Sequence, residues 1–306
     1  MSIKSEQIKE YAADLGFVLC GISEAAPVSA DVAIGYSRYI ATGAHARMEY
    51  LTRNIEKRLD IGRLVDGARS VISCAVSYNN PEPVSESNDE LYIARYARFT
   101  DYHNIIRARL KLLADRIGKH NDNNCYTRCF VDTAPLLEKY FACKAGLGWV
   151  GKNNLLINAR YGSQILLGEI VINYELDYDH PVENACGQCS LCIDHCPGGA
   201  IGKDCFNSNK CVSYHTIESE EVMPCSMVKA TAGHVFGCDR CQTICPYNQK
   251  AEPNTDPELM FRYSSISYVD LMTMSESQFN EKYSDTPLSR AGLERLRYIA
   301  SLSRCV

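Results

Sequence analysis

The sequence predicts a mixed α/β protein that carries a cysteine-rich metal module and ends in helices. Two observations support this prediction: apolar strand-like runs alternate with amphipathic helices over residues 1–180, and ten of the 16 cysteines lie between Cys186 and Cys245. The composition, 46% hydrophobic and 23% charged, is that of an ordinary globular protein and excludes a disordered or collagen-like chain. We therefore expect an α/β domain over residues 1–180, a metal module over 181–250 and a helical tail over 251–306.

Within the first domain, periodicity and turn residues predict individual elements. Helical spacing of apolar residues predicts helices over 5–16 and 106–117, and apolar runs predict strands over 17–22, 70–78 and 125–131. Pro135 is expected to open a helix at its first position and Gly146 to close it. Two further strands, 155–158 and 162–173, are expected to flank a turn at 160–162, and residues 277–283 and 288–302 to form the tail helices.

The charge distribution and the N-terminal residues bear on nucleic-acid binding, secretion and membrane insertion. The net charge of −5 excludes a chain that is basic throughout, but residues 41–160 hold 18 Lys and Arg against 13 Asp and Glu. That excess of positive charge has two explanations, solvated helix faces or a basic rim around a phosphate-rich ligand. The first residues lack the apolar core of a signal peptide, and no apolar run approaches the ~18 residues that span a bilayer, so we expect a cytoplasmic protein without membrane contact.

The strongest motif is the run C-G-Q-C-S-L-C-I-D-H-C-P, which has the C-x2-C-x2-C-x3-C-P spacing of bacterial ferredoxins. Two-residue gaps let three thiolates reach three irons of one 4Fe-4S cubane, and the fourth cysteine ligates the other cluster. A second run, C-D-R-C-Q-T-I-C-P, follows the same logic. The first cluster is therefore expected to be held by Cys186, Cys189, Cys192 and Cys245.

The second cluster has three clear ligands, Cys196, Cys238 and Cys241. Its fourth ligand is one of Cys205, Cys211 and Cys225, and spacing alone does not choose among them. Zinc is the alternative metal, because it also accepts four cysteines. The remaining cysteines are expected to be small core residues without a metal role; they are Cys20, Cys74, Cys125, Cys129, Cys143 and Cys305.

Several motifs in order along the chain resemble those of one enzyme family. They are MEYL at 48–51, RLD at 58–60, DGARSVI at 66–72, ARYARFTDYH at 94–103, VDTAPLLEK at 131–139, GLGWVGKNNLLI at 146–157, GSQILLGEI at 162–170, CVSYHTIE at 211–218 and GCDRCQTICPYN at 237–248. In combination they resemble the epoxyqueuosine reductases, cobalamin-dependent iron–sulfur enzymes of queuosine synthesis in tRNA. The resemblance also implies distant kinship with corrinoid-containing reductive dehalogenases. The length of the chain is that expected for the short form of the family, which lacks a C-terminal helical-repeat domain.

The resemblance implies a set of functional residues. Cys211 matches the cluster cysteine of the family's C-x-S-Y-x-T-I-E motif, and Asp132 matches the proton donor. The alternative for Asp132 is a helix N-cap, because it precedes Pro135. The family-matching candidates for cobalamin contact are Arg58, Tyr96, His103, Lys152, Asn153 and Ser163. Ligation of cobalt by His103 is not expected, because Ile106 stands where the D-x-H-x-x-G motif requires glycine.

The same resemblance implies two cofactors and a nucleic-acid substrate. The cofactors are two 4Fe-4S clusters and cobalamin, and the substrate is tRNA carrying epoxyqueuosine in its anticodon loop. We expect a monomer that takes electrons from an external donor. Candidates for contact with tRNA phosphates are basic side chains; they are Arg95, Arg98, Arg107, Arg109, Arg290, Arg295 and Arg297.

Three functions are compatible with these motifs. The first is reduction of epoxyqueuosine to queuosine in tRNA, with electrons passing through the clusters to cobalamin. The second is a corrinoid-dependent reductase of a small molecule, which would ignore tRNA. The third is a non-enzymatic electron carrier, although residues 1–180 form a larger domain than a carrier needs.

Overall fold

A four-stranded antiparallel sheet forms the centre of the molecule in this computed structural model, which describes residues 3–81, 89–120, 125–203, 205–231 and 233–303. Its strand order is β1 (Leu19–Glu24), β2 (Ser70–Ser77), β7 (Ile165–Ile172) and β4 (Thr127–Phe130). Both central strands are buried along nearly their whole length, which explains why they read as continuous apolar runs in the sequence. The strands expected over 17–22, 70–78, 125–131 and 162–173 are thus present.

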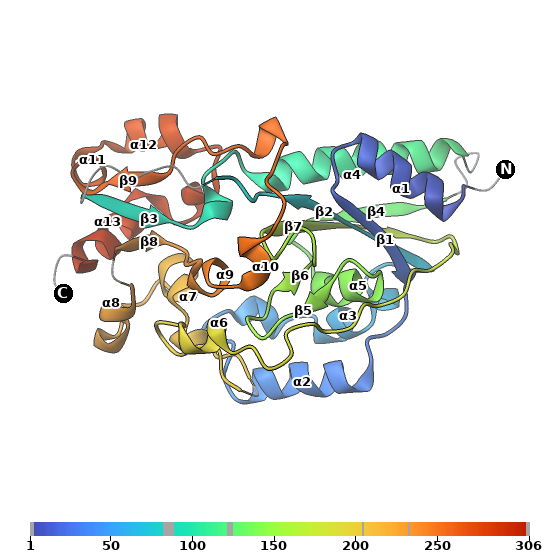
Figure 1. Cartoon of the computed structure of the whole chain (residues 1–306), viewed down its shortest axis with the longest axis horizontal. Coiled ribbons are helices and arrows are strands. Elements are labelled where there is room, and N and C mark those ends of the chain that lie inside the picture. Colours follow the sequence, from blue (N-terminus) through green and yellow to red (C-terminus); the bar gives the residue numbers. More distant parts are fainter. Residues whose placement is uncertain (1–2, 82–88, 121–124, 204, 232, 304–306) are drawn as a thin grey trace.

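Helices cover both faces of this sheet (Figure 1). On one face, α1 (Ser5–Asp14) and α4 (Tyr102–His120) pack against Ile72 and Ile170. On the other face, α5 (Glu138–Lys144) packs against Ala75 and Val171. Because successive strand residues point to opposite faces, Glu169 of β7 faces α5 together with Val171.

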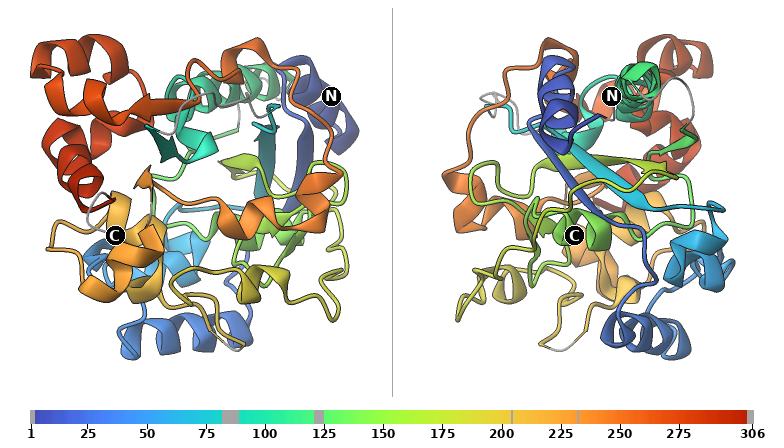
Figure 2. Two further views of the ribbon diagram at one scale, coloured as in Figure 1. Left: turned by 60° about the vertical axis from the view of Figure 1, so that its left-hand side comes forward. Right: turned by 90° about the vertical axis from the view of Figure 1, so that its right-hand side faces the viewer.

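A second, smaller sheet joins the three expected parts of the chain. Its strand order is β8 (His234–Phe236), β3 (Glu90–Ile93) and β9 (Ser265–Ser267), so each strand comes from a different part. A second hydrophobic core forms around this sheet and the C-terminal helices, which lie at the end of the molecule away from α1 (Figure 2). The division at residues 180 and 250 therefore does not correspond to three separate bodies, because β3 pairs with both other segments.

Two local expectations are corrected by the structure. Pro135 does not open a helix, because α5 begins only at Glu138; Gly146 does follow the helix, with φ of 76°. The strand expected over 155–158 is β6 (Leu156–Ile157), which pairs with β5 (Trp149–Val150) rather than with β7. The hairpin places Trp149 against the cysteine segment, where Cys245 and Tyr247 pack on it.

The other helices surround this framework. In the N-terminal part they are α2 (Ala30–Ala41), for which the sequence analysis predicted no element, and α3 (Ile55–Leu59). In the cysteine segment and the tail they are α6 (Leu191–Asp194), α7 (Val212–Ile217), α8 (Cys225–Thr231), α9 (Arg240–Thr243), α10 (Pro246–Gln249), α11 (Tyr268–Thr273), α12 (Glu276–Tyr283) and α13 (Gly292–Ser303). Across the described ranges, no helix has the length and apolar character needed to cross a membrane.

Candidate functional site

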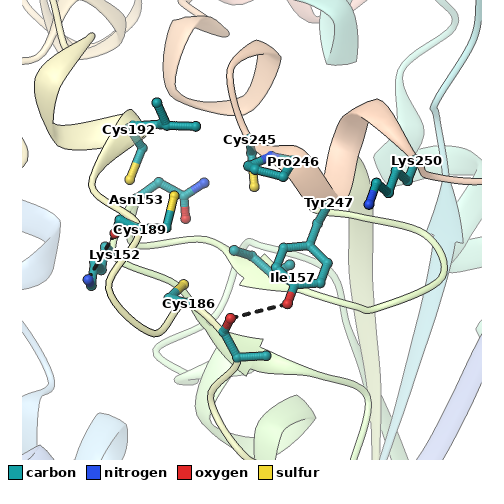
Figure 3. A pocket seen from close by; sticks show the side chains of 12 residues that line it. Lys152, Asn153, Ile157, Cys186, Cys189, Cys192, Cys245, Pro246, Tyr247 and Lys250 are labelled. Atoms are coloured by element: carbon teal, nitrogen blue, oxygen red, sulfur yellow. Dashed lines mark hydrogen bonds between the residues drawn. The ribbon is translucent and has the colours of Figure 1, made fainter.

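The four cysteines assigned to the first cluster line one cavity. Cys186, Cys189, Cys192 and Cys245 surround a space of about 310 Å³, with Ile157 and Tyr247 on its wall (Figure 3). Cys189 and Cys192 flank the start of α6, whereas Cys245 immediately precedes α10. The crossover that the spacing predicted, in which the last cysteine of the second run joins the first three of the first run, is the arrangement that the structure brings together.

The four cysteines assigned to the second cluster also gather in one place. Cys196 and Cys211 both act electrostatically on Cys241, and Cys238 lies beside Cys241 in the same group. Burial raises the pKa of the Cys241 thiol well above its usual value, and neighbouring thiols add to the increase. A bound cluster would stabilise these thiols as thiolates.

The two unassigned candidates for the second cluster lie elsewhere. Cys205 lines a different cavity, and Cys225 is exposed at the start of α8. Of the three cysteines that spacing left open, only Cys211 therefore has a place in the group around Cys241. Among the described residues, no set of three Cys, His, Asp or Glu side chains converges on a single ion.

A large cleft opens between the sheet domain and the cysteine segment. Its volume is about 1520 Å³, which exceeds the about 300–1,000 Å³ of common small-molecule pockets. Its walls come from α2, α3, segment 132–140, the β5–β6 hairpin and segment 205–207. Tyr39 on α2 connects this cleft to the second cysteine group. Its hydroxyl lies 2.7 Å from that of Ser208, and burial and the nearby Cys211 thiol contribute to raising the pKa of the Tyr39 hydroxyl.

Asp132 points into this cleft from the end of β4. Its side chain is 55% exposed, and its Oδ2 accepts a hydrogen bond of 3.1 Å from the Tyr102 hydroxyl. His103 Nε2 lies 3.8 Å from the same oxygen. Asp132 caps no helix in this structure, because α5 begins six residues later, so the N-cap alternative is not supported.

Asp101 orients the His103 ring toward Asp132. The Asp101 carboxylate lies 2.6 Å from His103 Nδ1 and also accepts from the His103 backbone N–H at 3.0 Å. Burial acts in the opposite direction, but these hydrogen bonds lower the pKa of Asp101 and keep it ionised. The ring nitrogen that does not face Asp101 is thereby held on the side of Asp132, which leaves His103 directed at a carboxyl group rather than at a metal.

Two glutamates behind Asp132 were not identified from the sequence. Glu138 Oε1 accepts a hydrogen bond of 2.6 Å from the Asp132 backbone N–H, and Glu169 lies near enough to influence the pKa of Glu138. Glu169 has no exposed surface. Burial and the charge of Asp132 together raise the pKa of Glu138 to about 7. One signal could have found this pair: Glu169 is the single charged residue in the apolar run ILLGEIVI.

The candidate cobalamin residues divide between two places. Arg58 and His103 line the large cleft. Lys152 and Asn153 instead line the first cysteine cavity, where Lys152 Nζ donates to the carbonyls of Gly187 and Cys189 at 2.8 and 2.9 Å. In this structure the β5–β6 hairpin directs both side chains at the cluster loop, so their contact with cobalamin stays a prediction.

Ser163 and Tyr96 also lie outside the cleft. Ser163 is buried and bonds to Gln242, which lies within the second cysteine run, and to Asn248, which follows that run. Tyr96 packs against Tyr102 and Phe236, and burial raises the pKa of its hydroxyl above its usual value. Neither side chain lines the cleft in this structure.

The cleft presents features that fit a large ligand with polar side groups. Arg58 Nε and Trp149 Nε1 are buried donors in its wall, and neither has a hydrogen-bond partner among the described residues. Tyr50, Val150 and Val182 are apolar side chains that line the same cleft and remain exposed. Unpaired donors beside exposed apolar surface suit a flat, largely apolar macrocycle that carries amide and phosphate groups.

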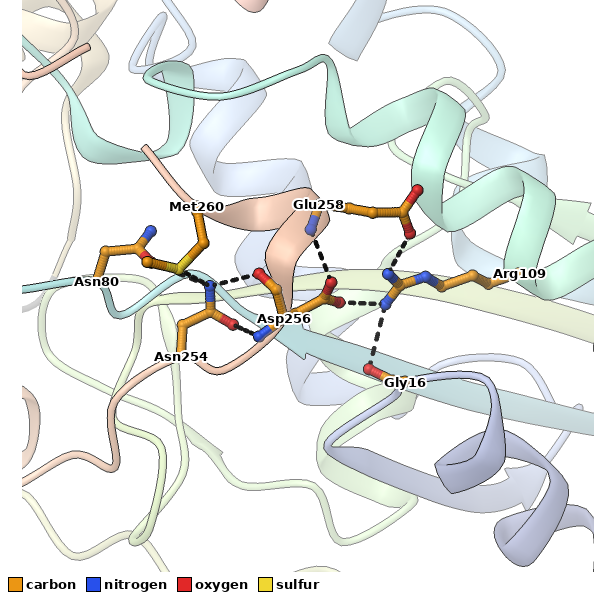
Figure 4. A network of polar contacts seen from close by, with 7 residues as sticks. All are labelled: Gly16, Asn80, Arg109, Asn254, Asp256, Glu258 and Met260. Atoms are coloured by element: carbon orange, nitrogen blue, oxygen red, sulfur yellow. Dashed lines mark hydrogen bonds and ion pairs between the residues drawn. The ribbon is translucent and has the colours of Figure 1, made fainter. Parts of the chain in front are cut away.

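Most of the arginines proposed for tRNA contact are bound within the protein. Arg109 bridges Asp256 at 2.5 Å and Glu258 at 2.6 Å and also donates to the Gly16 carbonyl, so its side chain is only 11% exposed (Figure 4). Arg98 is buried and donates to the Ile93 carbonyl at 2.7 Å.

Of the other five arginines, three are also bound within the protein and two are exposed. Arg95 donates to Asn80, Arg295 to the carbonyls of Glu221 and His215, and Arg297 to those of Leu271 and Met274. These three side chains are therefore engaged within the protein, and their contact with tRNA phosphates stays a prediction. Arg107 is exposed on α4, and Arg290 lines the cleft while paired with Glu218 at 2.7 Å. Of the proposed set, these two are exposed, and Arg290 also lines the cleft.

Comparison with known families and proteins agrees with this arrangement. The family "Epoxyqueuosine reductase QueG, DUF1730" matches residues 58–133, and the "4Fe-4S double cluster binding domain" matches residues 185–248. An epoxyqueuosine reductase of Leadbetterella byssophila is 38% identical over 293 residues, which cover 96% of each chain. The enzyme of Escherichia coli is 34% identical over 304 residues, 97% of this chain and 79% of its own length.

Solved structures show the same fold. The crystal structure of an epoxyqueuosine reductase with an epoxyqueuosine-modified tRNA-Tyr stem loop matches with a TM-score of 0.91 and 27% identity, over 97% of this chain and 80% of that one. A Bacillus subtilis structure, whose catalytic aspartate loop is swung out of the active site, matches with a TM-score of 0.89 and 25% identity over the same shares.

The fold, the two cysteine groups and the matched domain thus define an oxidoreductase with two 4Fe-4S clusters. The chain belongs to the epoxyqueuosine reductase family. The fold class and the family that the sequence motifs indicated are both confirmed.

Proposed function

We propose that this protein removes the epoxide oxygen of epoxyqueuosine in tRNA and so forms queuosine. The observation that carries the proposal is one cleft that contains an exposed Asp132 and lies against both cysteine groups. The second group adjoins the cleft through Tyr39, and the first through Trp149, on which Cys245 packs. Electrons and a proton can therefore reach the same space.

Asp132 is the proton donor in this proposal. Expulsion of the epoxide oxygen as water consumes two electrons and two protons, and a positioned carboxylic acid can supply a proton as the C–O bond breaks. Tyr102 and His103 both face Asp132 Oδ2 and hold it in the cleft. Burial and the Asp132 charge raise the pKa of Tyr102 above its usual value, so its hydroxyl remains a neutral hydrogen-bond donor.

Cobalamin is the cofactor that we place in the cleft, where Arg58, Trp149 and the exposed apolar residues of its walls would hold it. When bound, it supplies the electron transfer to the epoxide carbon that no amino-acid side chain can perform. Arg58 also donates to the Tyr50 carbonyl at 3.0 Å, which fixes its guanidinium while leaving Nε directed elsewhere. His103 takes no part as a metal ligand, because both of its nitrogens face carboxylates.

Contact with tRNA is proposed for the exposed rim of the cleft. Arg290 is 57% exposed, and Arg107 lies on the solvent side of α4. A net charge of −5 over the whole chain makes such local positive charge important for approach of a polyanion. We place the modified nucleoside in the cleft and the surrounding phosphates at this rim.

An anaerobic turnover assay tests the proposal. Reconstituted protein, cobalamin and a strong chemical reductant are mixed with tRNA carrying epoxyqueuosine, and digested nucleosides are analysed by mass spectrometry. Cobalamin-dependent loss of one oxygen mass is the expected result. If both clusters and cobalamin are bound but the nucleoside stays unchanged, the protein is a corrinoid reductase of another substrate. If cobalamin does not bind at all, an electron carrier remains as the function.

A further inference from the structure

A buried carboxylate lies within the second cysteine run, between two of the cysteines assigned to the second cluster. Asp239 follows Cys238 directly and precedes Cys241 by two residues. Its side chain is only 2% exposed, whereas aspartates in proteins are almost never buried so completely unless they are paired. Burial of this charge costs free energy that its surroundings have to offset.

Helix capping does not account for Asp239. The residue stands at the N-cap of α9, but its side chain accepts no hydrogen bond from the backbone of the first turn. Its carboxylate instead accepts from the Tyr92 hydroxyl at 2.9 Å and from the Arg95 backbone N–H at 2.7 Å. The Gln242 side-chain amide donates to it at 3.0 Å, while the Arg95 guanidinium donates to the Asn80 carbonyl. All three donors to the carboxylate are neutral groups, so they stabilise its negative charge without cancelling it.

This charge acts on the thiols of the second cysteine group. Burial raises the pKa of the Cys238 thiol to about 12, and the Asp239 charge contributes to the increase. Burial also raises the pKa of the Cys241 thiol, again with a contribution from Asp239. Arg240 carries the opposite charge beside the same cysteines, but its side chain is exposed and solvent screens it. The buried negative charge is therefore the stronger influence.

The first cysteine group has no acidic residue at the corresponding position. Gly187 stands there, directly after Cys186, and its carbonyl accepts from the exposed Lys152 ammonium at 2.8 Å. Among the described residues, those that line the cavity of this group include Lys152 and Lys250 but no aspartate or glutamate. The two groups thus differ in local charge, and the buried carboxylate is specific to the second.

A buried charge shifts the reduction potential of a nearby iron–sulfur cluster. A 4Fe-4S cluster gains one negative charge when it accepts an electron, so a fixed negative charge beside it makes reduction less favourable. The reduced form is then the stronger electron donor, because a lower potential corresponds to a more favourable free energy of oxidation. The second cysteine group adjoins the cleft through Tyr39, so this difference acts where the electron is used.

We propose that Asp239 lowers the reduction potential of the second cluster and makes it a stronger electron donor to the cleft than it would be beside a neutral residue. The step concerned is the uptake of one electron from an external reductant, in which no covalent bond forms or breaks. Asp239 does not line the cleft and acts only through the cluster, so it is a positioning residue. Its role in catalysis rests on the proposed function, but the potential is a property of the chain and its clusters alone.

A redox titration of the whole chain tests this inference without tRNA or cobalamin. The anaerobically reconstituted wild type, Asp239→Asn and Asp194→Asn are titrated and followed by electron paramagnetic resonance. Asp194 is the matched control, because it lies two residues from both Cys192 and Cys196 but is exposed. Asp239→Asn should favour reduction of one cluster by at least about tenfold, a rise of about 59 mV for a one-electron couple. Asp194→Asn should shift both potentials far less, because solvent screens its charge.

The affected cluster is identified in the Cys211→Ser background, in which only the first cluster should remain. Asp239→Asn should then change the remaining potential far less than it changes the potential of the second cluster in the complete protein. Three results would overturn the proposal: unchanged potentials in Asp239→Asn, an equal rise in Asp194→Asn, or an undiminished rise in the Cys211→Ser background.

A substitution of Tyr92 separates charge from packing. Tyr92→Phe removes a neutral donor and leaves the Asp239 charge less compensated, so the potential of the second cluster should fall instead of rising. A purely structural role predicts that both variants loosen the same contact and shift the potential in the same direction. If Asp239→Asn fails to assemble its clusters, this variant decides the question, and an unchanged or higher potential contradicts the proposal. A chain that shows the expected potentials but leaves epoxyqueuosine unchanged would lose only the proposed reaction.

Discussion

The cysteine groups and the carboxyl wall of the cleft are built in opposite ways. The cysteine groups come from two short runs in which spacing alone places most ligands around two centres. The carboxyl wall comes from Asp132, after a strand end, and Glu138, on a helix, with Glu169 of a distant strand buried behind them. A metal site can thus be encoded locally, whereas a proton-donating site requires a sheet that places remote residues together.

The largest effect is expected at the cysteine that spacing left undecided. Cys211→Ser should remove the second cluster and all turnover, and lower the iron content from about eight to about four atoms per chain. Cys225→Ser, at an exposed cysteine outside both groups, is the control and should keep full iron content. Iron analysis and electron paramagnetic resonance measure both. Loss of a cluster in Cys225→Ser instead would break the assignment of Cys211.

Asp132→Asn is the next largest change, and it tests the other region. We expect turnover to fall by about 10²–10⁴-fold, the usual contribution of a general acid, while iron content and cobalamin binding stay unchanged. Single-turnover assays with saturating cofactor isolate the chemical step. Retention of full activity would remove Asp132 from the mechanism and leave the carboxyl wall without a catalytic role.

The pH dependence of the free energy of unfolding tests the carboxyl wall separately from the cysteine groups. Burial raises the pKa of Glu138 from 4.5 to about 7 in the folded protein, so the folded state binds this proton more tightly than the unfolded state does. The resulting stabilisation is complete below pH 4.5 and is lost as pH rises through about 7. Its size is at most on the order of 3 kcal/mol.

Glu138→Gln removes this titration while its amide oxygen can still accept from the Asp132 N–H. Thermal unfolding at a series of pH values should therefore show a flatter profile for Glu138→Gln than for the wild type. Parallel profiles would mean that Glu138 does not titrate in this range.

The smallest effects are expected from substitutions of Lys152 and Arg58, which the sequence analysis both assigned to cobalamin. Lys152→Ala removes the donor to the Gly187 and Cys189 carbonyls, so we expect faster loss of the first cluster in air, by a few-fold, and unchanged cobalamin affinity. Arg58→Ala should weaken cobalamin binding by about tenfold and leave cluster lifetime unchanged. Absorption spectroscopy follows both properties, and an exchange of the two phenotypes would contradict the structural placement of these residues.

Much of the framework was predictable because its signals are local. The apolar runs of β2 and β7, the amphipathic pattern of α4 and the cysteine spacing each depend on residues that are close in sequence. The helix expected from Pro135 failed because the chain first turns through Asp132 with a positive φ and reaches Glu138 before helical hydrogen bonds begin. Residues 30–41 carried no recognised pattern, and as α2 they form one wall of the cleft.

The sequence by itself determined the cofactor chemistry, the family and the candidate acid, since motif identity and spacing carry that information. Only the tertiary structure decided which basic residues are free, which side chains face the cleft and what stands behind Asp132. Lys152 and Arg58 are both cations within family motifs, yet a hairpin directs one to a cluster and a helix directs the other to the cleft. The physical reason is that strand pairing and helix packing bring Glu138 and Glu169 near each other, although 30 residues separate them in the sequence.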